Sequence, residues 1–253
     1  MPETTPPAGA IDDSAAKPRF KTEPRAYLRR QLRLKLNDLL GRVGLRVFDR
    51  IDMTSARTAT KFNHIIDVGV AFGTPDLYEL GPNAQIELFE PQPQFHDLLE
   101  RGIMRQRKCR LHKIAIGAAN GEATFHLSGP ASASLLGTLD KPGRTFPTML
   151  VPVRRLDDVL KPADLIRPAI LKIDTEGYEL AVLEGAEGLL PSIDAVILEM
   201  HLGKAYAYRP QQILDIMARH GFALIDILDR EVRNARTTCC DMVFERPAKA
   251  DNL

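Results

Sequence analysis

Two short segments of the chain carry residues whose types and spacing could hold an adenosine. The first, Asp67–Gly73, begins within the mainly apolar segment 65–68 and continues into a glycine-containing turn, and the second is Glu90, which follows the mainly apolar segment 86–89. Glycine lets the backbone approach a ligand closely. A carboxylate about 20 residues further on, at the end of the next strand, is placed to accept hydrogen bonds from ribose hydroxyls. The sequence therefore predicts an adenosine site at the carboxyl ends of two neighbouring strands.

The spacing of the glycines indicates which adenosine compound would bind. A dinucleotide fingerprint has the pattern G-x-G-x-x-G, but only Gly69 and Gly73 are present in this turn. The looser pattern argues against a nicotinamide oxidoreductase and favours a ligand without pyrophosphate, such as S-adenosylmethionine. Thr74 and Pro75 follow as the expected N-cap and first residue of a helix.

Two further apolar strands end in groups that could act on an acceptor. Asp174 and Glu176 follow the segment 170–173, and Glu199 and His201 lie at the end of the segment 196–200. Asp174, Glu176 and His201 are the candidate catalytic residues, because an acceptor hydroxyl needs a base. A metal ion held by Asp174 and Glu176 is an alternative means of activating the hydroxyl. No clear metal-ligand spacing is present, so we assign no metal ligands.

An alternation of strands and helices must position these residues. The chain is 44% hydrophobic and 26% charged, values that are ordinary for a globular protein. We predict strands at His64–Val70, Ile86–Phe89, Arg110–Ile116, Glu122–Leu127, Ala169–Asp174, Ala195–Met200, Phe222–Ile227 and Thr237–Phe244. We predict helices near Pro75–Leu80, Gln94–Arg101, Leu156–Leu160, Glu179–Leu190 and Pro210–His220. This order predicts an α/β fold with a mostly parallel sheet and helices on both faces, and with an antiparallel hairpin turning at Asp229–Ala235.

The N-terminal part of the chain differs in composition from the rest. We expect a disordered tail at 1–25, a basic amphipathic helical arm at 26–54 and one α/β domain at 55–248. Residues 17–50 hold eleven Lys or Arg and three acidic residues, a net charge of +8. This segment is either a solvated helix packed on the domain, a contact for a partner helix, or a surface that binds an anionic membrane or a polyanionic substrate.

Charge and cysteine usage limit the remaining partners and the compartment. The whole chain has a net charge of only +1, which gives no reason to expect nucleic-acid binding. The three cysteines show no metal spacing, and no apolar run is long enough to span a membrane or to act as a signal peptide. We therefore expect a cytoplasmic protein with reduced cysteines, and we leave its oligomeric state open.

Taken together, the motifs resemble those of the FkbM-family S-adenosylmethionine-dependent methyltransferases, from about Ile65 to Phe244. The resemblance rests on the segments Ile66–Gly69, Phe89–Pro93, Ile114–Gly117 with Gly121, Arg155–Asp158 and Leu171–Gly177. The segment Gly73–Glu79 is similar to one branch of the family, whereas Ala71 stands where the family commonly has Asn.

The resemblance implies a class I methyltransferase fold with a seven-stranded, Rossmann-like sheet that binds S-adenosylmethionine across the strand tips. By position, it places Asp67, Gly69 and Gly73 at the methionine part and Glu90 at the ribose. It also places Ala115 and Ile116 near the adenine, and Asp174 and Glu176 at the junction of cofactor and acceptor.

The leading interpretation is therefore an S-adenosylmethionine-dependent O-methyltransferase. Its cofactor-binding residues would be Asp67, Gly69, Gly73, Thr74, Glu90, Ala115 and Ile116. Its acceptor would be a hydroxyl of a sugar, a glycan or a natural-product-like small molecule, selected by the loop-like stretch Ser128–Thr148. The alternative is a noncatalytic binding or scaffold protein that keeps the fold.

Overall fold

The computed structural model describes residues 61–127, 133–134, 147–202, 208–233 and 236–247. The predicted tail at 1–25, the basic arm at 26–54 and most of the stretch 128–148 lie outside these residues. Within the described part, every helix is too short or too polar to cross a membrane.

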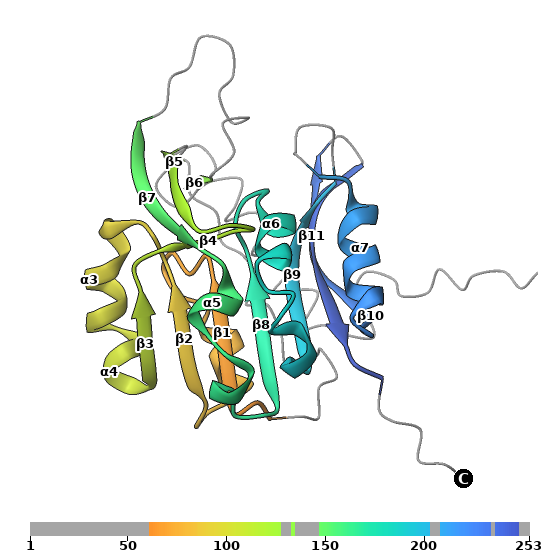
Figure 1. Cartoon of the computed structure of the whole chain (residues 1–253), viewed down its shortest axis with the longest axis horizontal. Coiled ribbons are helices and arrows are strands. Elements are labelled where there is room, and N and C mark those ends of the chain that lie inside the picture. The colour runs from red at the N-terminus through yellow and green to blue at the C-terminus, as the bar shows by residue number, and fades with distance from the viewer. Residues whose placement is uncertain (1–60, 128–132, 135–146, 203–207, 234–235, 248–253) are drawn as a thin grey trace, which may run out of the picture. The chain divides into compact units, whose positions relative to one another are not determined.

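The centre of the described structure is a seven-stranded sheet (Figure 1). Its strands, in spatial order, are β10 (Ala223–Arg233), β11 (Arg236–Glu245), β9 (Ala195–His201), β8 (Ala169–Ile173), β1 (His64–Val68), β2 (Gln85–Phe89) and β3 (Lys108–His112). The neighbours from β9 to β3 all pair in parallel, whereas β11 runs antiparallel to both β9 and β10. This arrangement confirms the predicted seven-stranded, mostly parallel sheet.

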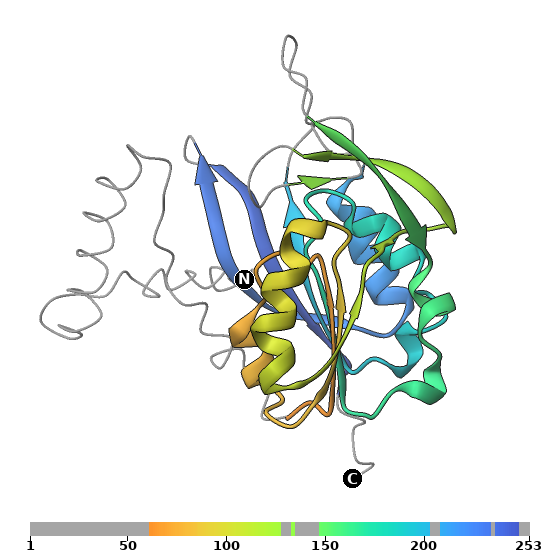
Figure 2. The same ribbon diagram turned by 90° about the vertical axis from the view of Figure 1, so that its left-hand side faces the viewer.

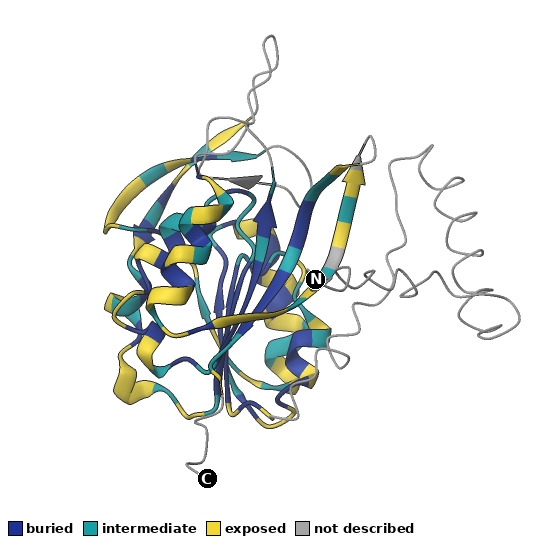
Figure 3. Cartoon of the chain, turned by 90° about the vertical axis from the view of Figure 1, so that its right-hand side faces the viewer, coloured by how far each residue is buried: buried dark blue, intermediate teal, exposed yellow. Residues whose placement is uncertain are grey.

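Helices cover both faces of this sheet, so its central strands are buried on both sides (Figures 2 and 3). One face packs against α2 (Pro75–Glu79), α3 (Pro93–Arg101) and α4 (Ile103–Gln106). The opposite face packs against α5 (Leu156–Val159), α6 (Glu179–Glu184) and α7 (Pro210–Arg219). Short 3-10 helices follow α5 and α6 at Pro162–Asp164 and Leu190–Ser192. Because strands buried on both faces need near-continuous apolar runs, a charged residue within β1 or β8 is costly and calls for an explanation.

A second, four-stranded sheet was not predicted. It consists of β4 (Ala115–Ile116), β7 (Thr148–Arg154), β5 (Gly121–Leu127) and β6 (Ala133–Ser134), in that order, and lies beyond the carboxyl ends of the central strands (Figure 1). The predicted single strand Arg110–Ile116 is therefore wrong, because β3 ends at His112 and β4 belongs to the other sheet. The sequence of β7 does not predict a strand, because it contains Pro152 and proline is uncommon within strands.

Two other predicted boundaries need correction. The helix expected at Glu179–Leu190 ends at Glu184, where Gly185 is the C-cap. A Cβ at Gly185 would lie 2.1 Å from the carbonyl oxygen of Gly117, so the backbones meet too closely there for a side chain. The hairpin turn expected at Asp229–Ala235 is shorter, because the strands continue to Arg233 and Arg236.

The Arg155–Asp158 segment, which helped to identify the family resemblance, has a structural role. The Arg155 guanidinium donates to both carboxylate oxygens of Asp157, at 2.9 and 2.7 Å, and to the carbonyl oxygen of Ala118 at 2.8 Å. Asp157 also accepts the backbone N–H of Gly188 at 3.0 Å. A bidentate pair of this kind fixes geometry as well as charge, so the segment holds α5 against the loops before β5 and after α6.

Candidate functional site

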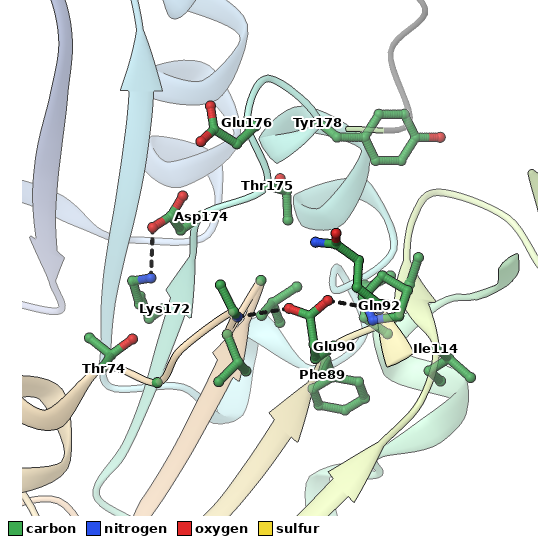
Figure 4. A pocket seen from close by; sticks show the side chains of 18 of the residues that line it. Thr74, Phe89, Glu90, Gln92, Ile114, Lys172, Asp174, Thr175, Glu176 and Tyr178 are labelled. Atoms are coloured by element: carbon green, nitrogen blue, oxygen red, sulfur yellow. Dashed lines mark hydrogen bonds and ion pairs between the residues drawn. The ribbon is translucent and has the colours of Figure 1, made fainter. Parts of the chain in front are cut away.

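A cavity of about 350 Å³ lies at the carboxyl ends of β1, β2 and β8. Its volume is in the range of pockets that bind small molecules. Of the predicted site residues, those that line it are Gly69, Gly73, Thr74, Glu90, Ala115, Ile116, Asp174 and Glu176. Asp67 and His201 are not among the lining residues. The close-up in Figure 4 shows Phe89, Gln92 and Ile114 on one side of the cavity and Lys172, Asp174 and Glu176 on the other.

The turn after β1 forms one wall of the cavity and needs its glycines. Gly69 has a φ of 82° and Gly73 a φ of 97°, both in the region that favours glycine. A Cβ at Gly69 would lie only 1.8 Å from the carbonyl oxygen of Asp174, so the turns after β1 and β8 touch at this point. Ala71 also has a positive φ, 46°, which is uncommon for a residue with a side chain. The loop is therefore held in a conformation that the surrounding contacts must stabilise.

Glu90 at the tip of β2 provides such a contact. Its two carboxylate oxygens accept the backbone N–H groups of Ala71 and Gln92, each at 2.8 Å, and its side chain is buried (Figure 4). Burial raises the pKa of Glu90, while these two N–H groups oppose the increase. Because an ionised carboxylate has about four acceptor positions, both oxygens can accept further hydrogen bonds from a ligand in the cavity.

Asp67 lies beneath the turn and connects it to the helix that follows. The Tyr78 hydroxyl donates to Asp67 Oδ2 at 2.7 Å and accepts the backbone N–H of Thr74 at 3.0 Å. Asp67 is fully buried, and burial raises its pKa. In this structure Asp67 therefore acts on the cavity through Tyr78 and the loop backbone. Thr74 occupies the N-cap position of α2 as predicted, but its side chain makes no capping hydrogen bond.

Lys172 has no predicted role, but it lines the cavity on the side that also holds Asp174 and Glu176, called the charged side below. Its ammonium lies 2.9 Å from Asp174 Oδ2 and 3.9 Å from Asp67 Oδ1. Although burial alone lowers the pKa of a lysine, the two carboxylates raise the pKa of Lys172 well above its usual range. The sequence held a signal for it, because a lysine within the apolar run 169–173 is unusual in a strand buried on both faces.

The turn after β8 presents the two predicted acids to the cavity. Burial disfavours the charged form of Asp174, but the Lys172 ammonium outweighs this effect and lowers the pKa of Asp174. Glu176 has a φ of 54° and Gly177 a φ of 103°. The backbone N–H groups of Thr175 and Gly177 donate to Glu179 Oε1, at 3.2 and 2.8 Å. The turn is thereby held in a conformation that costs about 1–3 kcal/mol for a residue with a side chain, a strain often found at functional sites.

His201 lies beside the charged side of the cavity. Its Nε2 is 3.1 Å from Glu199 Oε2, and the two side chains lie on one side of β9 because they are two residues apart on a strand. The pKa of Glu199 is raised to about 7, mainly because the side chain is buried and also because the negative charge of Asp174 is near. Burial lowers the pKa of His201, but the hydrogen bond that its ring donates to Glu199 and the charge of that carboxylate outweigh burial and raise the pKa. The structure therefore places His201 next to Glu199, one side chain removed from the groups that line the cavity.

The other side of the cavity is mainly apolar. Ala115 and Ile116 come from β4 and are both buried. The lining residues that the sequence analysis did not assign there are Phe89, Pro91, Gln92, Ile114 and Phe125. Phe125 could not be found from local patterns, because it reaches the cavity only through the unpredicted second sheet. The cavity thus combines an apolar side, a fixed carboxylate at Glu90 and a charged side.

Comparison with known proteins gives one family and two named relatives. The methyltransferase FkbM domain matches residues 67–224. Hexuronic acid methyltransferase AglP of Haloferax volcanii is 28% identical over 138 residues, which are 54% of this chain and 55% of the relative. The 2-O-methyltransferase NoeI of Sinorhizobium fredii is 29% identical over an alignment of 141 residues that covers 50% of this chain and 58% of the relative.

The two alignments cover about half of this chain, and they span little more than half the length of each relative. Among solved structures, the chain is similar to magnesium protoporphyrin IX methyltransferase (ChlM) of Synechocystis, with a TM-score of 0.43 and 10% identity. That similarity covers 87% of this chain and 82% of the other.

Proposed function

Because the chain belongs to the FkbM methyltransferase family, we propose that it transfers a methyl group from S-adenosylmethionine to a hydroxyl of a sugar or a glycan. The family match agrees with the resemblance drawn from the sequence. The observation that carries the proposal is the cavity, in which the Glu90 carboxylate lies between the apolar side and the two acids Asp174 and Glu176. The names of the two relatives, a hexuronic acid methyltransferase and a 2-O-methyltransferase, support a carbohydrate hydroxyl as the acceptor.

The residues of the cavity fit S-adenosylmethionine. Glu90 would hold the ribose, because its oxygens are fixed by the N–H groups of Ala71 and Gln92 and retain acceptor capacity. The apolar side, including Ala115 and Ile116, would hold the adenine. The glycine turn and the charged side would hold the methionine part. When bound, S-adenosylmethionine supplies a methyl group on a positively charged sulfur.

The chain's own contribution to the chemistry is positioning and removal of a proton. Alignment of two reactants can supply about 7–11 kcal/mol of the reduction in barrier. As the new C–O bond forms and the bond between the methyl group and sulfur breaks, the acceptor oxygen becomes positive and its proton becomes acidic, so a carboxylate in the cavity can accept that proton. We assign this role to Glu176, because it lines the cavity and because the Lys172 ammonium lowers the pKa of Asp174, which makes Asp174 a weaker base. Asp174 would remain ionised and favour positive charge at this side of the cavity.

A product assay tests the function. The purified chain is incubated with trideuteromethyl-labelled S-adenosylmethionine and a panel of methyl glycosides of hexuronic acids and neutral hexoses, with 2-deoxy glycosides as matched controls. Mass spectrometry should show one labelled methyl group on a hydroxylated glycoside. If S-adenosylmethionine binds but no glycoside in the panel gains the label, the carbohydrate assignment fails.

Two variants of Glu176 separate catalysis from folding. Glu176→Gly removes the carboxylate but suits the φ of 54°, so its stability should equal or exceed that of the wild type. Its turnover should fall by about 10²–10⁴-fold, the usual contribution of a positioned base. Glu176→Gln should lose turnover similarly, and Glu184→Gln on the exposed side of α6 is the matched control. Near-normal turnover in Glu176→Gly would remove Glu176 from the mechanism.

A further inference from the structure

Pairing between β9 and β11 brings together metal-binding side chains that are far apart in the sequence. In this antiparallel pair, His201 lies opposite Cys239 and Glu199 lies opposite Asp241. Residues two apart on a strand share a face, and directly opposite residues have close Cβ atoms. Glu199, His201 and Cys239 therefore project from the same face of the sheet.

The three side chains are close enough to share one ion. One ligand atom from each of Glu199, His201 and Cys239 can be chosen so that all three lie within 4.8 Å of one another. Zinc bonds of about 2.0–2.3 Å in a tetrahedral arrangement place ligand atoms about 3.3–3.8 Å apart. Modest adjustment of the side chains is therefore sufficient. His201 and Cys239 are buried, and Glu199 is 23% exposed, so a bound ion would be largely shielded from solvent.

We propose that Glu199, His201 and Cys239 form a binding site for a divalent metal ion of the zinc type, beside the cavity. A set of one carboxylate, one imidazole and one thiolate suits Zn²⁺, whereas Mg²⁺ and Ca²⁺ prefer oxygen ligands alone. This set has no local sequence motif, because the sheet and not the spacing along the chain brings its members together.

The position of the site connects it to the proposed reaction. Asp174 contacts Glu199 and lines the cavity, and Asp241 lines the cavity from the strand position opposite Glu199. Three protein ligands leave one coordination position of a tetrahedral ion for water or for an acceptor oxygen. An ion at this position would lower the pKa of an acceptor hydroxyl. This second step, activation of the acceptor hydroxyl by the ion, rests on the proposed function, whereas binding of the ion does not.

Cobalt spectroscopy tests binding directly on the full chain. The protein is reduced, freed of metal with a chelator and titrated with Co²⁺, then with Zn²⁺ as competitor. We expect one equivalent of Co²⁺, a thiolate-to-cobalt charge-transfer band in the near ultraviolet, and its loss when Zn²⁺ displaces the cobalt. Absence of saturable binding, or a cobalt spectrum without a thiolate band, would overturn the proposal.

A neighbouring cysteine offers a matched control. Cys240 is also buried, but it packs in the core on the opposite face of the sheet. Cys239→Ser should lose the thiolate band and bind Co²⁺ at least ~100-fold more weakly, while Cys240→Ser should keep both the band and the affinity. His201→Asn should weaken binding without removing the band. A band that survives in Cys239→Ser and disappears in Cys240→Ser would show that the ion binds elsewhere.

Methyl transfer is then measured with the metal-free and the zinc-loaded protein. A higher turnover in the zinc-loaded protein supports the second step, and equal turnover contradicts that step while the binding result stands. A chain that binds metal but methylates no acceptor would refute the proposed function and leave the metal site intact.

Discussion

Replacement of Glu90 by glutamine is the most direct test of the cofactor site. The glutamine side chain has nearly the same shape, but it has one oxygen where Glu90 has two. Because the two carboxylate oxygens accept the N–H groups of Ala71 and Gln92, one of these donors would face an amide NH₂ in Glu90→Gln. The variant therefore loses the negative charge and one of the two bonds that fix the loop.

The expected loss of affinity follows from these contacts. A hydrogen bond to a charged group contributes about 1.5–3 kcal/mol, against about 0.5–1.5 kcal/mol for a neutral pair. Weaker bonds to the ribose and a less well fixed loop together should cost about 2–4 kcal/mol, or roughly 30-fold to 1,000-fold in Kd. The free energy of unfolding should change less, because the variant also removes a buried charge whose pKa is raised by burial.

Isothermal titration with S-adenosylhomocysteine measures the affinity, and urea unfolding measures the stability. The control is Glu100→Gln on the exposed side of α3, which should leave the affinity unchanged and should alter the stability only slightly, because it removes only a half-exposed ion pair with Lys113. The reasoning fails if Glu90→Gln binds within threefold of the wild type. It also fails if affinity is lost only in proportion to unfolded protein, since that would make Glu90 a residue of the fold alone.

Three further predictions follow from the packing and charge of the cavity. Gly69→Ala should destabilise the protein by roughly 2–5 kcal/mol in urea unfolding, because its Cβ would collide with the Asp174 carbonyl oxygen at a φ of 82°. Gly121→Ala, whose Cβ would meet nothing within 4 Å, should change stability by less than about 1 kcal/mol. Lys172→Met should cost about 3–5 kcal/mol by leaving the buried Asp67 and the partly exposed Asp174 without their cation, whereas the exposed Lys161→Met should be nearly neutral; equal effects would contradict the charged network. S-adenosylmethionine should bind more tightly than S-adenosylhomocysteine, which lacks the sulfonium charge, and titrations at rising salt should show this preference decreasing; a ratio independent of salt would argue against charge attraction.

The central fold was predictable because its signals are local. Buried strands such as 65–68 and 169–173 are short apolar runs followed by turns, and this pattern predicts a parallel sheet with ligands at its carboxyl edge. The second sheet was not predictable in the same way. Its strands β5 and β7 are largely exposed or half-buried, and they are stabilised by pairing with each other across a long stretch of chain.

The residues of the site divide in the same way, into those with a local sequence signal and those without one. Gly69, Glu90 and Asp174 were identified because each follows an apolar run, and the structure brings all three to one cavity. Asp67 was expected at the ligand from its position alone, but its side chain turns beneath the loop to Tyr78. Cys239 became relevant only through the register between β9 and β11, which depends on the whole sheet.

The charge of the cavity explains why a lysine is present in a buried strand. Among the described lining residues, Glu90, Asp174, Glu176 and Asp241 are acidic and Lys172 is the only base. Carboxylates gathered in a low-dielectric site repel one another, so their ionised state is costly unless cations are near. Lys172 offsets part of this cost permanently through Asp174 and Asp67. The remaining negative charge favours a cationic ligand, so the acidic residues that repel one another in the cavity are those that would select a sulfonium. The cost measured for Lys172→Met therefore tests whether this balance of charge, and not the shape of the turn alone, maintains the site.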